Sequence, residues 1–337
     1  MRYIRKGAVM LFLLALTGCS KDEAGNDSDA PVPVRFEAGS PEVFKSRSLI
    51  ESESALREVG FGVFAYYTGA SGWGTVGSST TPNFMYNQQV TWSSDHWTYT
   101  PVKYWPNDNY PADNSGATGS QTHSYVSFFA YAPYFDPSSR PASGVTDIGA
   151  NNVSGAPTVT YTWAADADLL YDYKKDCYKT MTSPGTYGSV GGSVPFIFKH
   201  ALAKVEFKAR RDNGTLGTIT INSLSITSNG ATSGTFNLSE ATWSSIPDAA
   251  SPLTSLAESK TVPIDYNETV SLGSSLMIPR KVTFTHDFHY TIQSIDNDLP
   301  ATAISPITLE VGHKYTITFV ISHYSVKVET TKYTEQW

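Results

Sequence analysis

The feature that most constrains the fold is a repeated alternation of apolar and polar residues in short runs. In the run 201–209, apolar residues occupy every second position: Ala201, Ala203, Val205, Phe207 and Ala209. Because successive side chains of a β-strand point to opposite faces, this run predicts a strand with one buried and one largely solvated face. Similar runs recur between clusters of Gly, Pro, Asn and Asp, whereas only residues 46–59 show a loose helical spacing. The sequence therefore predicts an all-β protein.

Individual runs indicate where the strands lie. Residues 61–67 are apolar at positions of both parities, which predicts a central strand covered on both faces. Apolar residues at 90–92 and 97–99 flank a polar turn and predict a hairpin. Residues 125–132 form another strong apolar run, and the alternation slips by one position at 222–223, where we expect a β-bulge.

Three long polar stretches interrupt the first half of the chain, at residues 107–121, 134–156 and 172–193. Loops of this length are uncommon in a compact domain unless they bind a partner or lack fixed structure. We therefore expect a first half with long loops and a more regular second half.

The amino terminus has the pattern of an export signal. Basic residues precede an apolar run, residues 8–16, that is too short to cross a bilayer, and the segment Leu16-Thr17-Gly18-Cys19 follows it. We expect residues 1–18 to be a lipoprotein signal peptide and the thiol of Cys19 to be acylated, which would anchor the protein stably in a membrane. The following residues, 20–23, resemble the signal that directs lipoproteins of the Bacteroidetes to the outer face of the outer membrane. A polar tether over residues 19–33 then leads into the fold.

Charge and cysteine content exclude some classes of partner. The formal net charge is −7 and no basic block lies beyond the signal region, which argues against nucleic acid and against an anionic membrane face as partners. Once Cys19 is an anchor, Cys177 is the only remaining thiol, so we expect no intrachain disulfide. Cys177 lies in an expected loop with no activating basic environment, and we interpret it as an inert thiol.

Enzymatic motifs are lacking in the sequence, which has no phosphate-binding glycine loop, no zinc-ligand spacing and no nucleophile elbow. The densest carboxylate cluster is formed by Asp166, Asp168, Asp172 and Asp176, and we interpret it as solvated surface because its spacing fits no calcium loop. His286 and His289 are expected to point to opposite faces of a strand and not to share a metal. We expect no catalytic residue, no metal and no cofactor.

Several motifs together resemble the fimbrillin family of the Bacteroidetes. Besides the lipoprotein signal, they are Val34-Arg35-Phe36, Arg47, Phe61-Gly62-Val63-Phe64-Ala65, Tyr104-Trp105-Pro106, Ser127-Phe128-Phe129-Ala130-Tyr131-Ala132-Pro133, Asp168-Leu169-Leu170-Tyr171, Phe198-Lys199-His200-Ala201-Leu202-Ala203-Lys204-Val205 and Gly312-His313-Lys314-Tyr315. No single motif is specific, but their order and spacing span nearly the whole chain. The segment 198–205 is the most informative of them.

This resemblance implies a type V pilin made of two transthyretin-like β-sandwich domains in tandem. About 300 residues after the signal also exceed the usual size of a single core. We place the amino-terminal domain, with its long loops, at residues 34–198 and the carboxy-terminal domain at residues 199–337.

The resemblance also implies how such a subunit would assemble. In pilins of this kind an arginine-directed protease removes the lipidated first strand, and the open groove accepts a strand from a neighbouring pilin subunit. Here residues 34–36 are the candidate removable strand and Arg47 is the candidate processing site, with Arg35 and Arg57 as competitors. The candidate donor residues lie near the carboxy terminus: Tyr315, Ile317, Phe319, Ile321, Val326 and Val328.

The role within a pilus stays open among stalk, tip and anchor subunits. The long loops favour a tip or accessory subunit that binds a glycan or a protein on a host or bacterial surface. The alternative is a surface lipoprotein that binds glycans without polymerising, because the first half contains Trp73, Trp92, Trp97, Trp105 and Trp163. Most of these rings are expected to fill the core, and Trp73, in a glycine-rich stretch, is the best candidate for an exposed contact.

Overall fold

Strands dominate the computed structural model, which describes residues 31–39, 52–107, 123–164, 166–179, 193–247, 251–256 and 258–337. The described helices are short: α1 (Glu53–Val59), α2 (Trp73–Val76) and the 3-10 helix η1 (Gly77–Ser79). The prediction of an all-β protein is therefore confirmed. Cys19 and Arg47, the expected lipidation and processing sites, lie outside the described residues.

The first large sheet has six strands. Their order is β10 (Lys199–His200), β8 (Leu170–Cys177), β5 (Tyr125–Ala132), β2 (Phe61–Gly69), β3 (Met85–Ser93) and β4 (His96–Thr98). β2 lies inside this sheet and its first six residues are buried, as the sequence predicted. The predicted hairpin is β3–β4, in which Trp92 lies opposite Trp97.

Two elements close to the amino terminus pack beside this sheet. β1 (Arg35–Gly39) pairs in parallel with β9 (Ser193–Ile197) to form a separate two-stranded sheet. Helix α1 begins where the Ser52 hydroxyl accepts a hydrogen bond from the backbone N–H of Ala55, and it ends at Gly60, which has a positive φ of 62°. The helical spacing read from the sequence is thus confirmed for its second part.

A four-stranded sheet draws its strands from distant parts of the sequence. Its order is β14 (Thr242–Ser244), β13 (Ser233–Asn237), β7 (Thr158–Thr162) and β6 (Gly144–Ile148). β6 lies in the stretch 134–156 that we expected to be loop, and residues 172–177 of another expected loop belong to β8. The loop interpretation was wrong for these residues. In β6 a register shift between Val145 and Asp147 breaks the alternation by which a strand is read from sequence.

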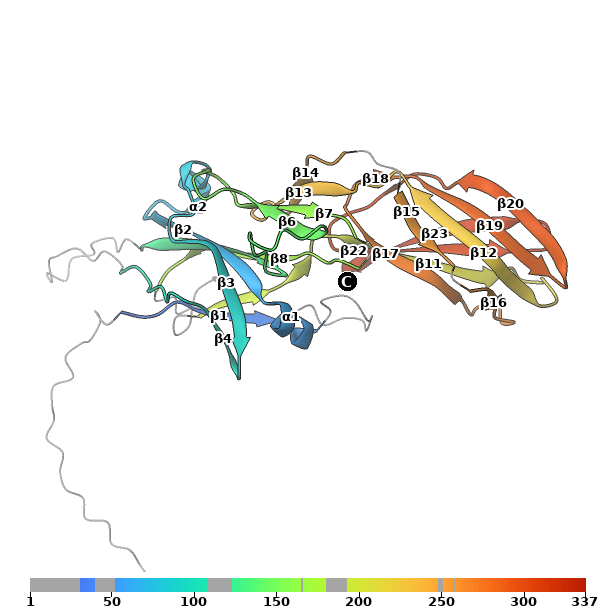
Figure 1. Ribbon diagram of the computed structural model, residues 1–337, viewed down its shortest axis with the longest axis horizontal. Helices are drawn as coiled ribbons and strands as arrows, with labels where there is room; N and C mark the ends of the chain where they lie inside the picture. Colours follow the sequence, from blue (N-terminus) through green and yellow to red (C-terminus); the bar gives the residue numbers. More distant parts are fainter. Residues whose placement is uncertain are drawn as a thin grey trace, which may run out of the picture. The chain divides into compact units, whose positions relative to one another are not determined.

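The remaining strands form two larger sheets and a small one (Figure 1). One contains β17 (Val270–Met277), β11 (Ala203–Arg211), β22 (His313–Ile321) and β23 (Val326–Gln336), in that order. Another contains β15 (Ser251–Ser255), β12 (Ile219–Ser228), β19 (Phe284–Ile292) and β20 (Ile295–Ala303), and β16 (Lys260–Val262) also pairs with β12. β18 (Lys281–Val282) pairs with β21 (Ile307–Thr308).

Most of the buried apolar side chains of these two larger sheets form one hydrophobic cluster. Ala203, Val205, Phe207 and Ala209 of β11 all belong to it, which confirms the predicted buried face. The opposite face is not largely solvated as predicted, because Leu202 and Lys204 are buried too. The β12–β19 register shifts between Ile221 and Ser223, which confirms the expected bulge. The division into domains at residues 198 and 199 stays a prediction.

Candidate functional site

The amino-terminal strand has backbone partners on both sides. Along β1, residues from Arg35 to Gly39 pair in parallel with Ser193 to Ile197. On the other side, the N–H of Val34 donates to the carbonyl of Lys103 at 2.8 Å, and the N–H of Trp105 donates to the carbonyl of Val32 at 2.9 Å. The segment 32–39 therefore occupies a slot between β9 and residues 103–105.

The side chains of this segment alternate between a buried and an exposed face. Val34 and Phe36 are buried, whereas Arg35 and Glu37 are exposed. The Phe36 ring contacts four aromatic rings, with centroid distances of 5.3 Å to Tyr99, 5.7 Å to Phe196, 6.0 Å to Phe128 and 6.2 Å to Phe61. Loss of this strand would open an apolar groove lined by aromatic rings.

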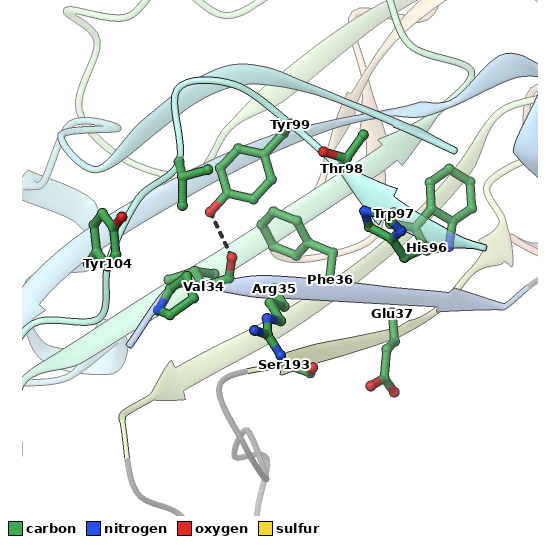
Figure 2. Close-up of a pocket in the computed structure, with 12 residues that line it drawn as sticks. Val34, Arg35, Phe36, Glu37, His96, Trp97, Thr98, Tyr99, Tyr104 and Ser193 are labelled. Carbon is green, nitrogen blue, oxygen red and sulfur yellow. Dashed lines mark hydrogen bonds between the residues drawn. The ribbon is translucent and has the colours of Figure 1, made fainter. Parts of the chain in front are cut away.

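A cavity of about 520 Å³ runs along the strand, lined by residues of β1, β4 and the segment that follows β4. Figure 2 shows Phe36 on the side of β1 that faces Tyr99, with Arg35 and Glu37 on the other side. The Tyr99 hydroxyl donates to the carbonyl of Val34 at 2.8 Å. At the rim, Tyr104 is 51% exposed. The aromatic rings thus lie on one face of the strand and the charged groups on the other.

The candidate donor residues fall in two strands with different surroundings. Tyr315, Ile317, Phe319 and Ile321 lie in β22, which pairs with β11 on one side and β23 on the other, and all four are buried. Val326 and Val328 lie in β23, which is an edge strand, and they are partly buried. β23 can leave its sheet without breaking the order of the other strands, whereas β22 cannot.

The two competing cleavage residues are held in regular structure. Arg35 belongs to the paired strand β1. Arg57 lies in helix α1, where it forms an ion pair with Glu53 and its guanidinium carbon lies 3.8 Å from the centroid of the Trp92 ring. A protease needs an extended, accessible chain, so neither arginine is favourably presented. Processing at Arg47 stays a prediction.

Two residues of the aspartate cluster are buried, so their interpretation as solvated surface was wrong. Asp168 Oδ2 lies 3.0 Å from His200 Nδ1. Asp172 Oδ2 lies 2.7 Å from Lys174 Nζ and accepts the backbone N–H of Ile197 at 2.8 Å. His200 and Ile197 lie far along the chain, so the spacing of the aspartates could not reveal these partners. Within the part of the chain that the structure describes, no three His, Cys, Asp or Glu side chains gather as a metal site.

Trp73 does not form an exposed contact. It is 8% exposed, and its ring packs against Phe129 and Tyr66 with centroid distances of 4.7 and 4.9 Å. The indole N–H donates to the Ser239 hydroxyl at 3.2 Å. The glycine-rich sequence around Trp73 suggested exposure, but residues from distant strands cover the ring. The exposed aromatic ring at the cavity is Tyr104, which the sequence marked only as part of a motif.

Cys177 lies at the end of β8 and not in a loop, and it is buried. Burial raises the pKa of its thiol to about 12, against a smaller lowering by Lys174. Only the thiolate reacts with disulfide reagents. We expect Cys177 of the native protein to react at pH 8 about 1,000-fold more slowly than in urea, as measured with a chromogenic disulfide, because the thiolate fraction falls by that factor when the pKa rises to about 12. Equal reaction rates in the native protein and in urea would contradict the burial of this thiol.

The described residues contain no helix that is long and apolar enough to cross a membrane. Their fold and their strand-filled groove define a class, that of all-β proteins built from several sheets. One solved structure with this fold is a fimbrial protein from Bacteroides vulgatus, with 23% identity and a TM-score of 0.64, over 91% of this chain and 99% of the other.

The fimbrillin-like family model matches residues 58–337, and the chain belongs to this family. A curated relative is fimbrium subunit Fim1C of Phocaeicola vulgatus, 31% identical over 223 residues. This match covers 63% of the chain and 52% of the relative, so the chain spans about half the length of that protein. The family and this relative are described as fimbrial proteins and not as enzymes.

Proposed function

We propose that the chain is a structural and adhesive subunit of a type V pilus, exported as a lipoprotein and assembled with other pilin subunits by strand exchange. The observation that carries this proposal is the segment 32–39. Its backbone has hydrogen-bonding partners on both sides, and Phe36 fills a site between four aromatic rings. It therefore occupies a site that another strand of similar pattern could fill.

Removal of this segment would leave a strongly unsatisfied surface. The facing edge of β9 and the carbonyl of Lys103 would lose their backbone partners, and the rings around Phe36 would face water. Unpaired strand edges and apolar grooves are satisfied by an added strand, which restores both the hydrogen bonds and the burial. Strand addition is the reaction that this geometry favours after cleavage.

The carboxy-terminal strand β23 is the best donor in this proposal. It pairs only with β22, and Val326 and Val328 point to one face with the two-residue spacing of Val34 and Phe36. Donation of β22 would instead remove four buried residues from the core. This argument narrows the candidate donor from the whole region 315–328 to β23.

A lipid on Cys19 and a cut at Arg47 fit the order of the elements. β1 ends at residue 39 and α1 begins at residue 53, so a cut at residue 47 would separate the first strand from the rest of the fold. A cut at Arg57 would break α1, and one at Arg35 would leave most of β1 on the chain. The lipid would hold the subunit at the outer membrane until the cut.

Conservative replacement of the arginine tests this proposal. In the wild type, an arginine-specific protease should produce ladders of stable oligomers whose chains begin at Ser48. We expect Arg47→Lys to prevent both the cut and the ladder, because such a protease does not accept lysine. The matched variant Arg57→Lys should behave as the wild type. Gel electrophoresis and amino-terminal sequencing measure both effects, and ladders from Arg47→Lys that begin at Ser48 would contradict the assignment.

A second candidate function is glycan binding by a subunit that does not polymerise. The cavity beside β1 favours it, because Tyr104 and Tyr99 provide aromatic faces and His96 and Thr98 provide polar groups. The same protease treatment separates the two functions. A cleaved monomer that binds polysaccharide would favour the glycan-binding lipoprotein and contradict strand exchange.

A further inference from the structure

We infer that Trp337, which follows β23, occupies a socket formed by His200, Lys204 and the backbone of Gly312. In this socket it acts as a latch that holds the end of β23 against β22. The relevance of this latch to assembly rests on the proposed donation of β23, but the socket itself is argued from contacts alone. Trp337 is 3% exposed, although it follows an edge strand that carries mostly polar residues. The last residues of a domain are normally poorly ordered unless specific contacts hold them.

The contacts of Trp337 are specific. Its indole ring lies parallel to the His200 imidazole, with a centroid distance of 3.7 Å and an interplanar angle of 11°. The ammonium of Lys204 lies 4.9 Å from the indole centroid. The backbone N–H of Trp337 donates to the carbonyl of Gly312 at 3.1 Å. The ring is thus stacked on one side, close to a cation, and fixed through its own backbone.

The floor of the socket is rigid. His200 Nδ1 forms a hydrogen bond with Asp168 Oδ1 at 3.2 Å, and both side chains are 1% exposed. His200 belongs to β10, which pairs with β8, and the N–H of Gly312 donates to the carbonyl of Leu202 at 3.1 Å. These bonds hold the imidazole plane and the Gly312 carbonyl in place before the indole binds, so the socket is preorganised for an aromatic ring.

The socket ties β23 to a second hydrophobic cluster. Val326 and Val328, at the start of β23, pack against the cluster formed by β11, β12 and β22. Trp337 instead belongs to the cluster that contains Ala201 and Leu202. The start of β23 is therefore held by one hydrophobic cluster, and the residue that follows its end is held by another.

The last part of β23 depends most on this anchor. The pairing with β22 shifts between His313 and Tyr315, so the ladder is irregular close to the carboxy terminus. The preceding residues are polar, and Tyr333 is exposed. Among the described residues, the indole N–H of Trp337 has no hydrogen-bond partner, so stacking and burial of the ring hold it. Loss of the ring should free the end of β23 without disturbing the start.

Hydrogen exchange on the uncleaved full chain tests the latch. We expect Trp337→Ala to make the backbone amides of residues 330–333 exchange about tenfold faster, while the amides of β11 and β22 that face each other keep their rates. Trp337→Phe should give an intermediate increase, because a smaller ring still stacks in the socket. Tyr324→Ala is the matched control, since Tyr324 is 97% exposed and its loss should change nothing.

Two results would overturn the inference. One is unchanged exchange of residues 330–333 in Trp337→Ala, and the other is an equal increase over β11, β22 and β23, which would show general destabilisation. The measurement uses the monomer before cleavage, so it is independent of assembly. Failure of the wild type to form filaments would contradict the proposed function and leave this result unaffected.

Discussion

A disulfide that ties β23 to β22 should abolish filament assembly after cleavage, and reduction should restore it. Thr318 lies opposite Glu329 in this antiparallel pair, so Thr318→Cys with Glu329→Cys places two thiols at a separation that a disulfide can bridge. Glu329 forms an ion pair with Arg210 on an exposed surface, and loss of that pair should cost about 1 kcal/mol at most. The oxidised chain keeps its fold but cannot release its last strand.

A second disulfide serves as the control for this lock. Thr91 lies opposite Thr98 in the β3–β4 hairpin, which the proposed assembly leaves in place, so Thr91→Cys with Thr98→Cys should assemble in both redox states. The native thiol of Cys177 should not interfere, because burial raises its pKa to about 12. Oligomer ladders on non-reducing gels measure the outcome. Normal assembly by the oxidised β22–β23 variant would show that β23 is not the donor.

Phe36→Ala should lower the free energy of unfolding of the uncleaved chain by about 3–5 kcal/mol. The change removes a buried ring that contacts four others, and the groove cannot close around alanine because two of its walls are strands of the large sheet. Chemical denaturation followed by tryptophan fluorescence measures this loss, since Trp97 and Trp105 belong to the same cluster. The matched control is Glu37→Ala, whose exposed side chain should change stability by about 0.5 kcal/mol or less.

The effect of Phe36→Ala should differ between the uncleaved chain and the filament. If the first strand leaves the fold after the cut, the purified filaments of Phe36→Ala and of the wild type should be equally stable, because neither contains residue 36. A stability difference that persists in the filament would show that β1 is retained. The same residue thus separates the precursor from the assembled form.

Much of the fold could be predicted because the relevant signals are local. The alternation in 201–209 identified the buried face of β11, and the slip at 222–223 identified a bulge. β6 was missed because its own irregular register hides the alternation. Trp73 was misjudged because its burial depends on Phe129 and Ser239, which lie far away in sequence.

The candidate site shows the same division. In the sequence, Val34 and Phe36 are apolar and Arg35 between them is charged. This spacing alone showed that the side chains of Val34 and Phe36 could fill a groove. It could not reveal that the groove is aromatic or that residues 103–105 bond the strand from its second side. Asp168 looked like solvated surface until its partner, His200, was located.

The sequence by itself determined that the chain is built of strands and which face of the regularly alternating strands is apolar. Only the tertiary structure decided that β22 is central and β23 is an edge, and that Trp337 has a socket. The physical reason is that alternation is a property of a few neighbouring residues. The position of a strand in a sheet, and the partner of a buried ring or charge, depend on residues that only the folded chain brings together.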